Sequence, residues 1–228
     1  MPDRFRVEIA PSQHVTALRY PAAPGNRAGV TLILGHGAGA NQTSGFMVAF
    51  AAALAERGID TITFNFLYSE QGRRVPDPNA KLEGCWRRDW ERARRDQLRR
   101  RKAGARRQVH GRAHRIAGCR LRRRCDLAGL VFLGYPLHPP GRPDRMRAAH
   151  LREVKAPMLF VQGSRDTFGT PAELKPIVGQ LEAPADLFVV EGGDHSFKVP
   201  RSTGVSQREI HGAIQDRIAT WLRKIASG

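Results

Sequence analysis

Short apolar runs of strand length alternate with helical patterns along most of this chain. Apolar runs bounded by glycine or polar residues are typical of buried parallel strands. Such runs occupy residues 29–34, 60–66, 128–134, 157–162 and 186–190. Apolar residues at helical spacing predict helices over residues 46–57, 172–181 and 206–225, and the start of another helix near Leu82.

Residues 5–9 and 15–20 add an opening hairpin, whose turn we expect at Pro11-Ser12-Gln13. Strands that are separated by helices predict an α/β fold with a doubly wound, mostly parallel sheet. A length of 228 residues fits this fold as a single domain over residues 1–228.

The pattern breaks off in residues 87–124, which we call the basic window. It holds 16 Arg and 1 Lys against 3 acidic residues, and so carries 14 of the 17 net positive charges of the chain. Its apolar residues follow neither the strand period nor the helix period. We therefore expect the central strand of the sheet, at about residues 100–125, to be disrupted.

The cysteine content and the length of the apolar runs indicate a soluble protein of the cytoplasm. Cys85, Cys119 and Cys125 are too few and too irregularly spaced for a disulfide framework or a metal site. The first residues lack the apolar core of a signal peptide, and no apolar run approaches the roughly 20 residues of a membrane span. Reduced thiols and a cytoplasmic location are the expectation.

Three loops that carry candidate catalytic residues follow predicted strands, where open α/β sheets place their active sites. The loop Gly-His-Gly-Ala-Gly-Ala at 35–40 can turn a backbone N–H, that of Ala38, toward a developing oxyanion. In the loop at 163–169, Asp166 can orient a histidine, or can cap the following helix. In the loop at 191–197, His195 can act as a general base, or can be an ordinary exposed histidine.

The segments LILGHGAGA, GLVFLGYPLHPPG, MLFVQGSRDTFGT and VVEGGDHSFKVP resemble the small bacterial α/β-hydrolases of the dienelactone-hydrolase-like kind. The resemblance covers residues 29–86 and 126–224, and it implies the α/β-hydrolase fold. It also implies Asp166 and His195 as the acid and base of a Ser-His-Asp triad. Ala38 would form half of the oxyanion hole, in a loop shaped by Gly37 and Gly39.

The same resemblance implies a small-molecule substrate, a carboxylic ester or related acyl compound. It implies no metal and no organic cofactor, and we expect no specific nucleic acid and no membrane as partners. The sequence does not indicate the acyl group or the oligomeric state. The residues expected to line the substrate pocket are His36, Phe66, Tyr68, Tyr135 and His138.

The nucleophile is missing from this pattern. Related hydrolases carry their serine on a Gly-x-Ser-x-Gly turn after the fifth strand. The chain contains no such turn, and the basic window contains no serine. Cys85 and Cys119 do not lie on an elbow of this kind, while Ser164 and Ser196 adjoin the acid and the base. We expect the chain with this sequence to be inactive.

A shift of reading frame accounts for the missing turn. If most free third bases are G or C, the codons of residues 107–115, read one base later, give Gly-Lys-Ser-Met-Gly-Gly-Arg-Ile-Ala. The same offset from Lys102 permits the strand Lys-Leu-Val-Leu-Gly. We therefore hypothesise a frameshift near Trp86 and a compensating one near Cys125, in the gene or in its sequencing. A protein with the unshifted window should be poorly stable.

Two other functions stay open. The basic window would bind the phosphate backbone of a nucleic acid or another polyanion, with a steep dependence on salt. However, no nucleic-acid-binding motif accompanies it, and Trp90 is its single aromatic residue. The second alternative is a non-catalytic scaffold with a hydrolase fold.

Overall fold

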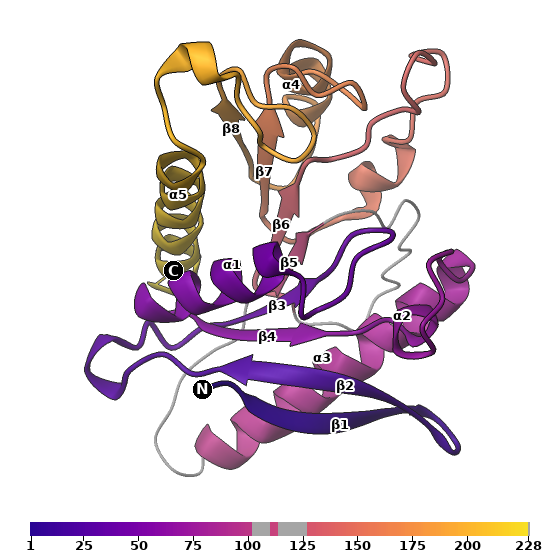
Figure 1. The fold of residues 1–228 in the computed structure, drawn as a ribbon, viewed down its shortest axis with the longest axis vertical. Coiled ribbons are helices and arrows are strands. Elements are labelled where there is room, and N and C mark those ends of the chain that lie inside the picture. The colour runs from indigo at the N-terminus through magenta and orange to yellow at the C-terminus, as the bar shows by residue number, and fades with distance from the viewer. Residues whose placement is uncertain (102–109, 114–126, 228) are drawn as a thin grey trace.

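The computed structural model describes residues 1–101, 110–113 and 127–227. One mixed sheet runs through this part of the chain, with the strand order β1-β2-β4-β3-β5-β6-β7-β8 (Figure 1). Its strands are β1 (Asp3–Ala10), β2 (Gln13–Tyr20), β3 (Thr31–Gly35), β4 (Asp60–Phe64), β5 (His110–Ala113), β6 (Leu130–Leu133), β7 (Met158–Gly163) and β8 (Ala185–Val190). The β1–β2 hairpin joins the sheet antiparallel to β4, and the strands from β4 to β8 are parallel.

Helices cover both faces of the sheet. They are α1 (Gly45–Glu56), α2 (Leu67–Glu70), α3 (Asn79–Arg101), α4 (Pro171–Val178) and α5 (Gln207–Ser227). Alternate strand residues point to opposite faces. In β6, Val131 and Leu133 pack toward α1 and α5, whereas Leu130 and Phe132 pack on the face that carries α4. Because both faces of β6 are buried, this strand is apolar throughout, as the sequence pattern indicates.

Most predicted elements are confirmed to within a few residues. The five buried strands appear as β3, β4, β6, β7 and β8, and the three helices as α1, α4 and α5. Helix α4 begins with a capping box, in which Thr170 accepts from the N–H of Glu173 while the Glu173 side chain accepts from the N–H of Thr170. Asp166 is therefore not the cap of this helix, and the alternative role considered for it is wrong.

Regular structure extends into the basic window despite its irregular apolar pattern. Helix α3 extends into it as far as Arg101, because Arg, Ala, Glu, Gln and Leu favour helix whatever their apolar spacing. Residues 110–113 form β5, which pairs in parallel with β3 and β6. The N–H and C=O groups of two neighbouring strands need partners, and any extended backbone can supply them. The expectation that the central strand is disrupted at about residues 100–125 is corrected for residues 110–113; residues 102–109 and 114–126 lie outside the described residues.

Helix α3 buries a carboxyl group where the basic window begins. Leu82, Cys85 and Trp86 are buried against the strands, and Asp89 continues the same helical face at 2% exposure. Neither carboxyl oxygen of Asp89 has a hydrogen-bond partner among the described residues. Burial raises the pKa of Asp89 well above its usual value. The buried face of α3 thus changes from apolar to ionisable within three residues.

Replacing Asp89 with leucine should stabilise the protein. Because the pKa of this carboxyl is higher in the folded than in the unfolded chain, the free energy of unfolding falls as the pH rises from about 4 toward the raised pKa. Asp89→Leu should remove this loss and increase the free energy of unfolding by about 1–3 kcal/mol at pH 8, and by less at pH 5. Thermal unfolding at both pH values measures the difference. Arg87→Leu, at an exposed position of the same helix, is the control. An unchanged or lower Tm for Asp89→Leu at pH 8 would contradict the expectation.

Candidate active site

Asp166 and His195 form a hydrogen-bonded pair. Asp166 lies in the loop after β7 and His195 in the loop after β8, and these strands are neighbours in the sheet. His195 Nδ1 lies 2.7 Å from Asp166 Oδ2. Because a carboxylate can only accept, Nδ1 donates, and the neutral imidazole has its lone pair on Nε2. The Asp166 side chain is 0% exposed and that of His195 20% exposed, so the imidazole reaches the surface while the carboxylate does not.

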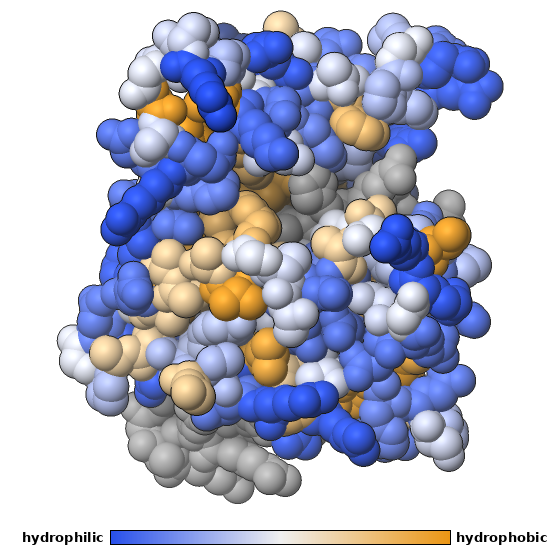
Figure 2. Space-filling model, viewed as in Figure 1, coloured by the Kyte–Doolittle hydropathy of each residue, from blue (hydrophilic) through white to orange (hydrophobic). Residues whose placement is uncertain are grey.

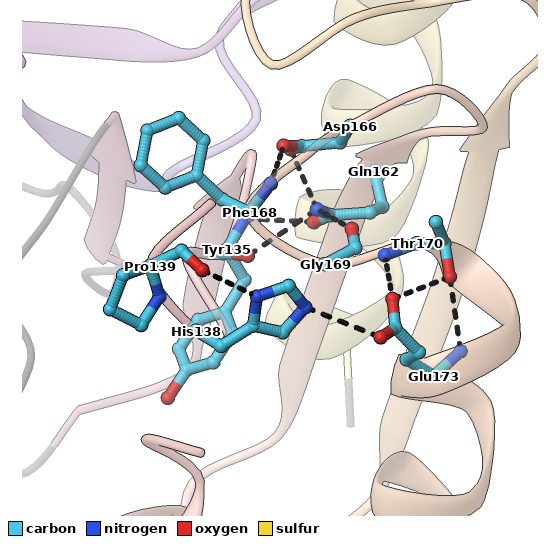
Figure 3. Close-up of polar contacts among 9 residues, drawn as sticks. All are labelled: Tyr135, His138, Pro139, Gln162, Asp166, Phe168, Gly169, Thr170 and Glu173. Carbon is cyan, nitrogen blue, oxygen red and sulfur yellow. Dashed lines mark hydrogen bonds and ion pairs between the residues drawn. The ribbon is translucent and has the colours of Figure 1, made fainter. Parts of the chain in front are cut away.

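Gln162 holds the carboxylate in place from the end of β7 (Figure 3). Its Nε2 donates to Asp166 Oδ2 at 2.8 Å and to the carbonyl of Gly169 at 2.7 Å, and its Oε1 accepts from the N–H of Tyr135 at 2.8 Å. The N–H of Phe168 donates to Asp166 Oδ1 at 2.9 Å. Three donors thus converge on one buried carboxylate.

Sequence reasoning missed Gln162, although the sequence carries a signal for it. The buried strand Met158–Gly163 is apolar up to Gln162, which is fully buried and is followed only by the final glycine. A buried amide needs partners for both its nitrogen and its oxygen. A glutamine at the carboxyl end of an apolar strand, four residues before a candidate acid, therefore indicates a positioning role.

Gly134 makes room for the histidine. It follows β6 with a φ of +64°, and a Cβ at this position would lie 3.0 Å from the carbonyl oxygen of His195 and 3.2 Å from its Nδ1. The ring of Phe168 packs against the imidazole, with 4.2 Å between the ring centroids. The imidazole is thereby held between the backbone of one loop and an aromatic ring of another.

The loop that carries His195 is a tight turn organised by Asp194. Asp194 Oδ1 accepts from the N–H groups of Ser196 and Lys198, at 2.8 and 2.9 Å. Phe197 has a φ of +60°, a left-handed conformation that is uncommon for a residue with a side chain. Its ring is buried in the core, which keeps this backbone conformation in place.

A cavity of about 500 Å³ brings the candidate groups together. Gly37, Ala38 and His195 line it, so the glycine loop after β3 and the base open onto the same space. Ala38 and Gly39 are exposed, and the N–H of Ala38 has no acceptor among the described residues. Apolar side chains form much of the remaining wall: Phe46, Met47, Leu133, Phe168 and Phe197. Figure 2 shows apolar residues gathered over α1, which supplies two of them, on a surface that is otherwise mostly polar.

The five residues expected in the substrate pocket are all buried, and none of them lines this cavity: His36, Phe66, Tyr68, Tyr135 and His138. The two histidines among them join separate parts of the chain. His36 donates from Nδ1 to the carbonyl of Gly37 and accepts at Nε2 from the N–H of Phe66, and burial lowers its pKa, so it ties the glycine loop to the β4–α2 connection. His138 connects its own loop to Glu173 of α4 (Figure 3). Contact of these residues with a substrate stays a prediction.

The described residues include no serine on a strand-to-helix elbow. A nucleophile elbow belongs after β5, where residues 114–126 lie outside the described residues and contain no serine in the sequence. Ser44 and Ser196 line the cavity, but Ser44 precedes α1 and Ser196 adjoins the base. Cys85 is buried on α3, and burial raises the pKa of its thiol to about 11. Cys85 therefore stays an unreactive thiol at neutral pH.

The described residues offer neither a membrane-spanning helix nor a metal-binding cluster. None of their helices combines the length and the apolar character that a membrane crossing requires. Nor do they contain three or more His, Cys, Asp or Glu side chains grouped so as to hold a metal ion.

A mostly parallel sheet with a hydrogen-bonded Asp–His pair beyond neighbouring strands is the architecture of the α/β-hydrolase fold. Residues 28–223 match the family described as "Alpha/beta hydrolase domain". The chain therefore belongs to this family.

Solved structures agree on the fold. An alpha-beta serine hydrolase homologue from Coxiella burnetii has 18% sequence identity and a TM-score of 0.66, over 96% of this chain and 97% of the other. A dienelactone hydrolase from Anabaena variabilis has 18% identity and a TM-score of 0.65, over 96% of each chain. A serine hydrolase without a lid from Xanthomonas campestris has 18% identity and a TM-score of 0.64, over 96% and 94%.

Removing the amide of Gln162 should destabilise the fold at this edge of the sheet. Gln162→Leu deletes four hydrogen bonds from a fully buried position and places an apolar group beside the Asp166 carboxylate. The free energy of unfolding should fall by about 3 kcal/mol, measured by chemical or thermal unfolding. Gln13→Leu, at an exposed position of β2, should leave it nearly unchanged. Equal stability of the two variants would show that Gln162 does not hold the carboxylate.

The contact between Gly134 and His195 can be separated from backbone strain. Gly134 and Gly141 have φ values of +64° and +70°, but a Cβ at Gly141 would meet no atom within 4 Å. Alanine at either position should cost about 1 kcal/mol for the left-handed backbone. Only Gly134→Ala should lower the Tm further and shift the NMR signals of the His195 ring. If Gly141→Ala shifts those signals equally, the contact at Gly134 does not position the base.

Proposed function

We propose that this chain derives from a serine-type acyl hydrolase, in which the acid, the base and one side of the oxyanion hole are built while the nucleophile is not encoded. The observation that carries the proposal is the 2.7 Å hydrogen bond between Asp166 and His195 beside a cavity that Ala38 also lines. The fold supports it, because this arrangement lies at the carboxyl ends of parallel strands, where hydrolase chemistry is found in this architecture.

In an intact chain, each group has a defined task. A serine after the central strand attacks the carbonyl carbon of an ester, and His195 Nε2 takes its proton. Asp166 stabilises the imidazolium through Nδ1, and the N–H of Ala38 donates to the oxyanion. The imidazolium then returns the proton to the departing alkoxide, which leaves an acyl-enzyme. Water, deprotonated by His195 in turn, hydrolyses that acyl-enzyme and restores the serine.

The frameshift hypothesis supplies the absent serine, and Asp89 supports it. Up to Trp86 the buried face of α3 is apolar, as a helix packed on a sheet requires, and at Asp89 that face carries a carboxyl group without a partner among the described residues. The change coincides with the start of the basic window. In the shifted reading, an apolar run at residues 102–106 would supply the central strand, and the Gly-x-Ser-x-Gly elbow would occupy residues 107–111, where the present chain begins β5.

The test compares the chain as it stands with a chain whose reading frame is restored between Trp86 and Cys125. The restored chain should hydrolyse p-nitrophenyl esters, and the present chain should not. In the restored chain, His195→Ala should lower kcat by about 10⁴-fold or more, and Asp166→Asn should also lower it strongly. Ser44→Ala and Ser196→Ala, both in the same cavity, serve as controls and should retain activity.

Two results would reject the proposal. A restored chain without esterase activity would show that the Asp–His pair does not serve an acyl transfer. Hydrolysis by the present chain that depends on Ser44 or Ser196 would show that the nucleophile lies elsewhere. Independent sequencing of the coding DNA from codon 80 to codon 130 decides the frameshift itself.

A further inference from the structure

Two polar side chains of α5 line the same cavity as the candidate base. They are Gln207 and His211, one helical turn apart at the start of the helix. The imidazole of His211 packs edge-on against Phe46 and Phe50 of α1, with ring centroids 5.4 and 6.3 Å away. One part of the cavity therefore combines an aromatic wall from α1 with two hydrogen-bonding groups from α5.

The hydrogen bonds of Gln207 determine what His211 can offer a ligand. Gln207 Nε2 lies 2.9 Å from the carbonyl oxygen of Phe197, and a carbonyl only accepts, so the amide orientation is settled. The same Nε2 lies 2.9 Å from His211 Nε2 and donates to it. His211 is therefore neutral and carries its proton on Nδ1. Burial also lowers the pKa of His211, which favours the neutral imidazole as well.

His211 Nδ1–H has no acceptor among the described residues, and the ring borders the cavity. The ring is half-buried, so a ligand that fills this part of the cavity displaces water from it and leaves Nδ1–H unpaired unless the ligand supplies an acceptor. The acceptor should be uncharged, because the donor is a neutral imidazole among aromatic rings, where an anion would lose its hydration. The volume of about 500 Å³ lies in the range of sites for small organic ligands.

We infer that this cavity selects acyl groups with an apolar body and an uncharged oxygen acceptor, such as a keto or ether oxygen, that receives the Nδ1–H of His211. The inference rests on the proposed function, since it takes the His195 side of the cavity as the place of the ester carbonyl. His211 is then a residue that determines specificity, and Gln207 positions it by fixing its tautomer.

The test uses the present chain, which lacks the nucleophile and so binds product carboxylates without reaction. Two ligands of similar shape are compared by isothermal titration calorimetry at pH 7.5, namely 5-oxohexanoate and 5-methylhexanoate. Both carry the same carboxylate, so any attraction to His195 or to Lys198, which also lines the cavity, is common to both. The keto compound should bind about fivefold more tightly, the value of one hydrogen bond.

His211→Phe should abolish this preference while keeping the aromatic packing against α1, and His14→Phe, at an exposed position of β2, should retain it. Equal binding of the two ligands by the unmodified chain would overturn the inference, as would a preference that survives His211→Phe.

A second measurement needs no variant. Long-range ¹H–¹⁵N spectra at pH 7.5 should show His211 neutral with its proton on Nδ1, and an Nε2–H tautomer or an imidazolium would overturn the inference.

Failure of this inference and failure of the proposed function can be told apart. A restored chain that hydrolyses esters without any preference for a keto group would contradict the inference alone. Loss of esterase activity in the restored chain, with the binding preference kept, would contradict the proposed function alone.

Discussion

The hydrogen bond between Asp166 and His195 is the interaction on which the rest of the site depends. It joins the loops beyond β7 and β8, and it requires a carboxylate that is removed from water. Such a group is stable only if donors surround it. Gln162 and the N–H of Phe168 provide them, and Gln162 also binds Tyr135 and Gly169. The acid thereby fixes the relative positions of three loops at the carboxyl edge of the sheet.

The chain buries a second carboxyl group, and the contrast is informative. Asp89 is as inaccessible as Asp166, at 2% and 1% exposure, but it has no hydrogen-bond partner among the described residues. Asp166 has three donors supplied by a strand, a loop and a neighbouring loop. A buried carboxylate is compatible with a stable fold when several donors bind it, whereas a buried carboxyl group without donors destabilises the folded state. The difference separates the part of the chain that follows the family pattern from the basic window.

The sequence predicted the buried strands, three helices and the Asp166–His195 pair, because each depends on local apolar runs and on loops that follow strands. It did not predict Gln162 or Gly134, whose roles arise only when β6, β7 and β8 lie side by side. The residues that line the cavity could not be predicted from the sequence either. Aromatic residues near the predicted strand ends, such as Phe66 and Tyr135, pack into the core, while Phe46 and His211 on helices border the cavity. Strand β5 was missed because backbone pairing formed it without an apolar pattern.

The Asp166–His195 pair and the basic window come from different parts of the sheet. Asp166, His195, Gln162 and Gly134 all derive from β6 to β8 and their loops, after the basic window in the chain. Their hydrogen bonds run among themselves, so the pair forms whether or not the central strand presents a serine. In this fold a nucleophile elbow depends on one strand and on the turn after it. A change confined to that stretch therefore leaves Asp166, His195 and the cavity assembled.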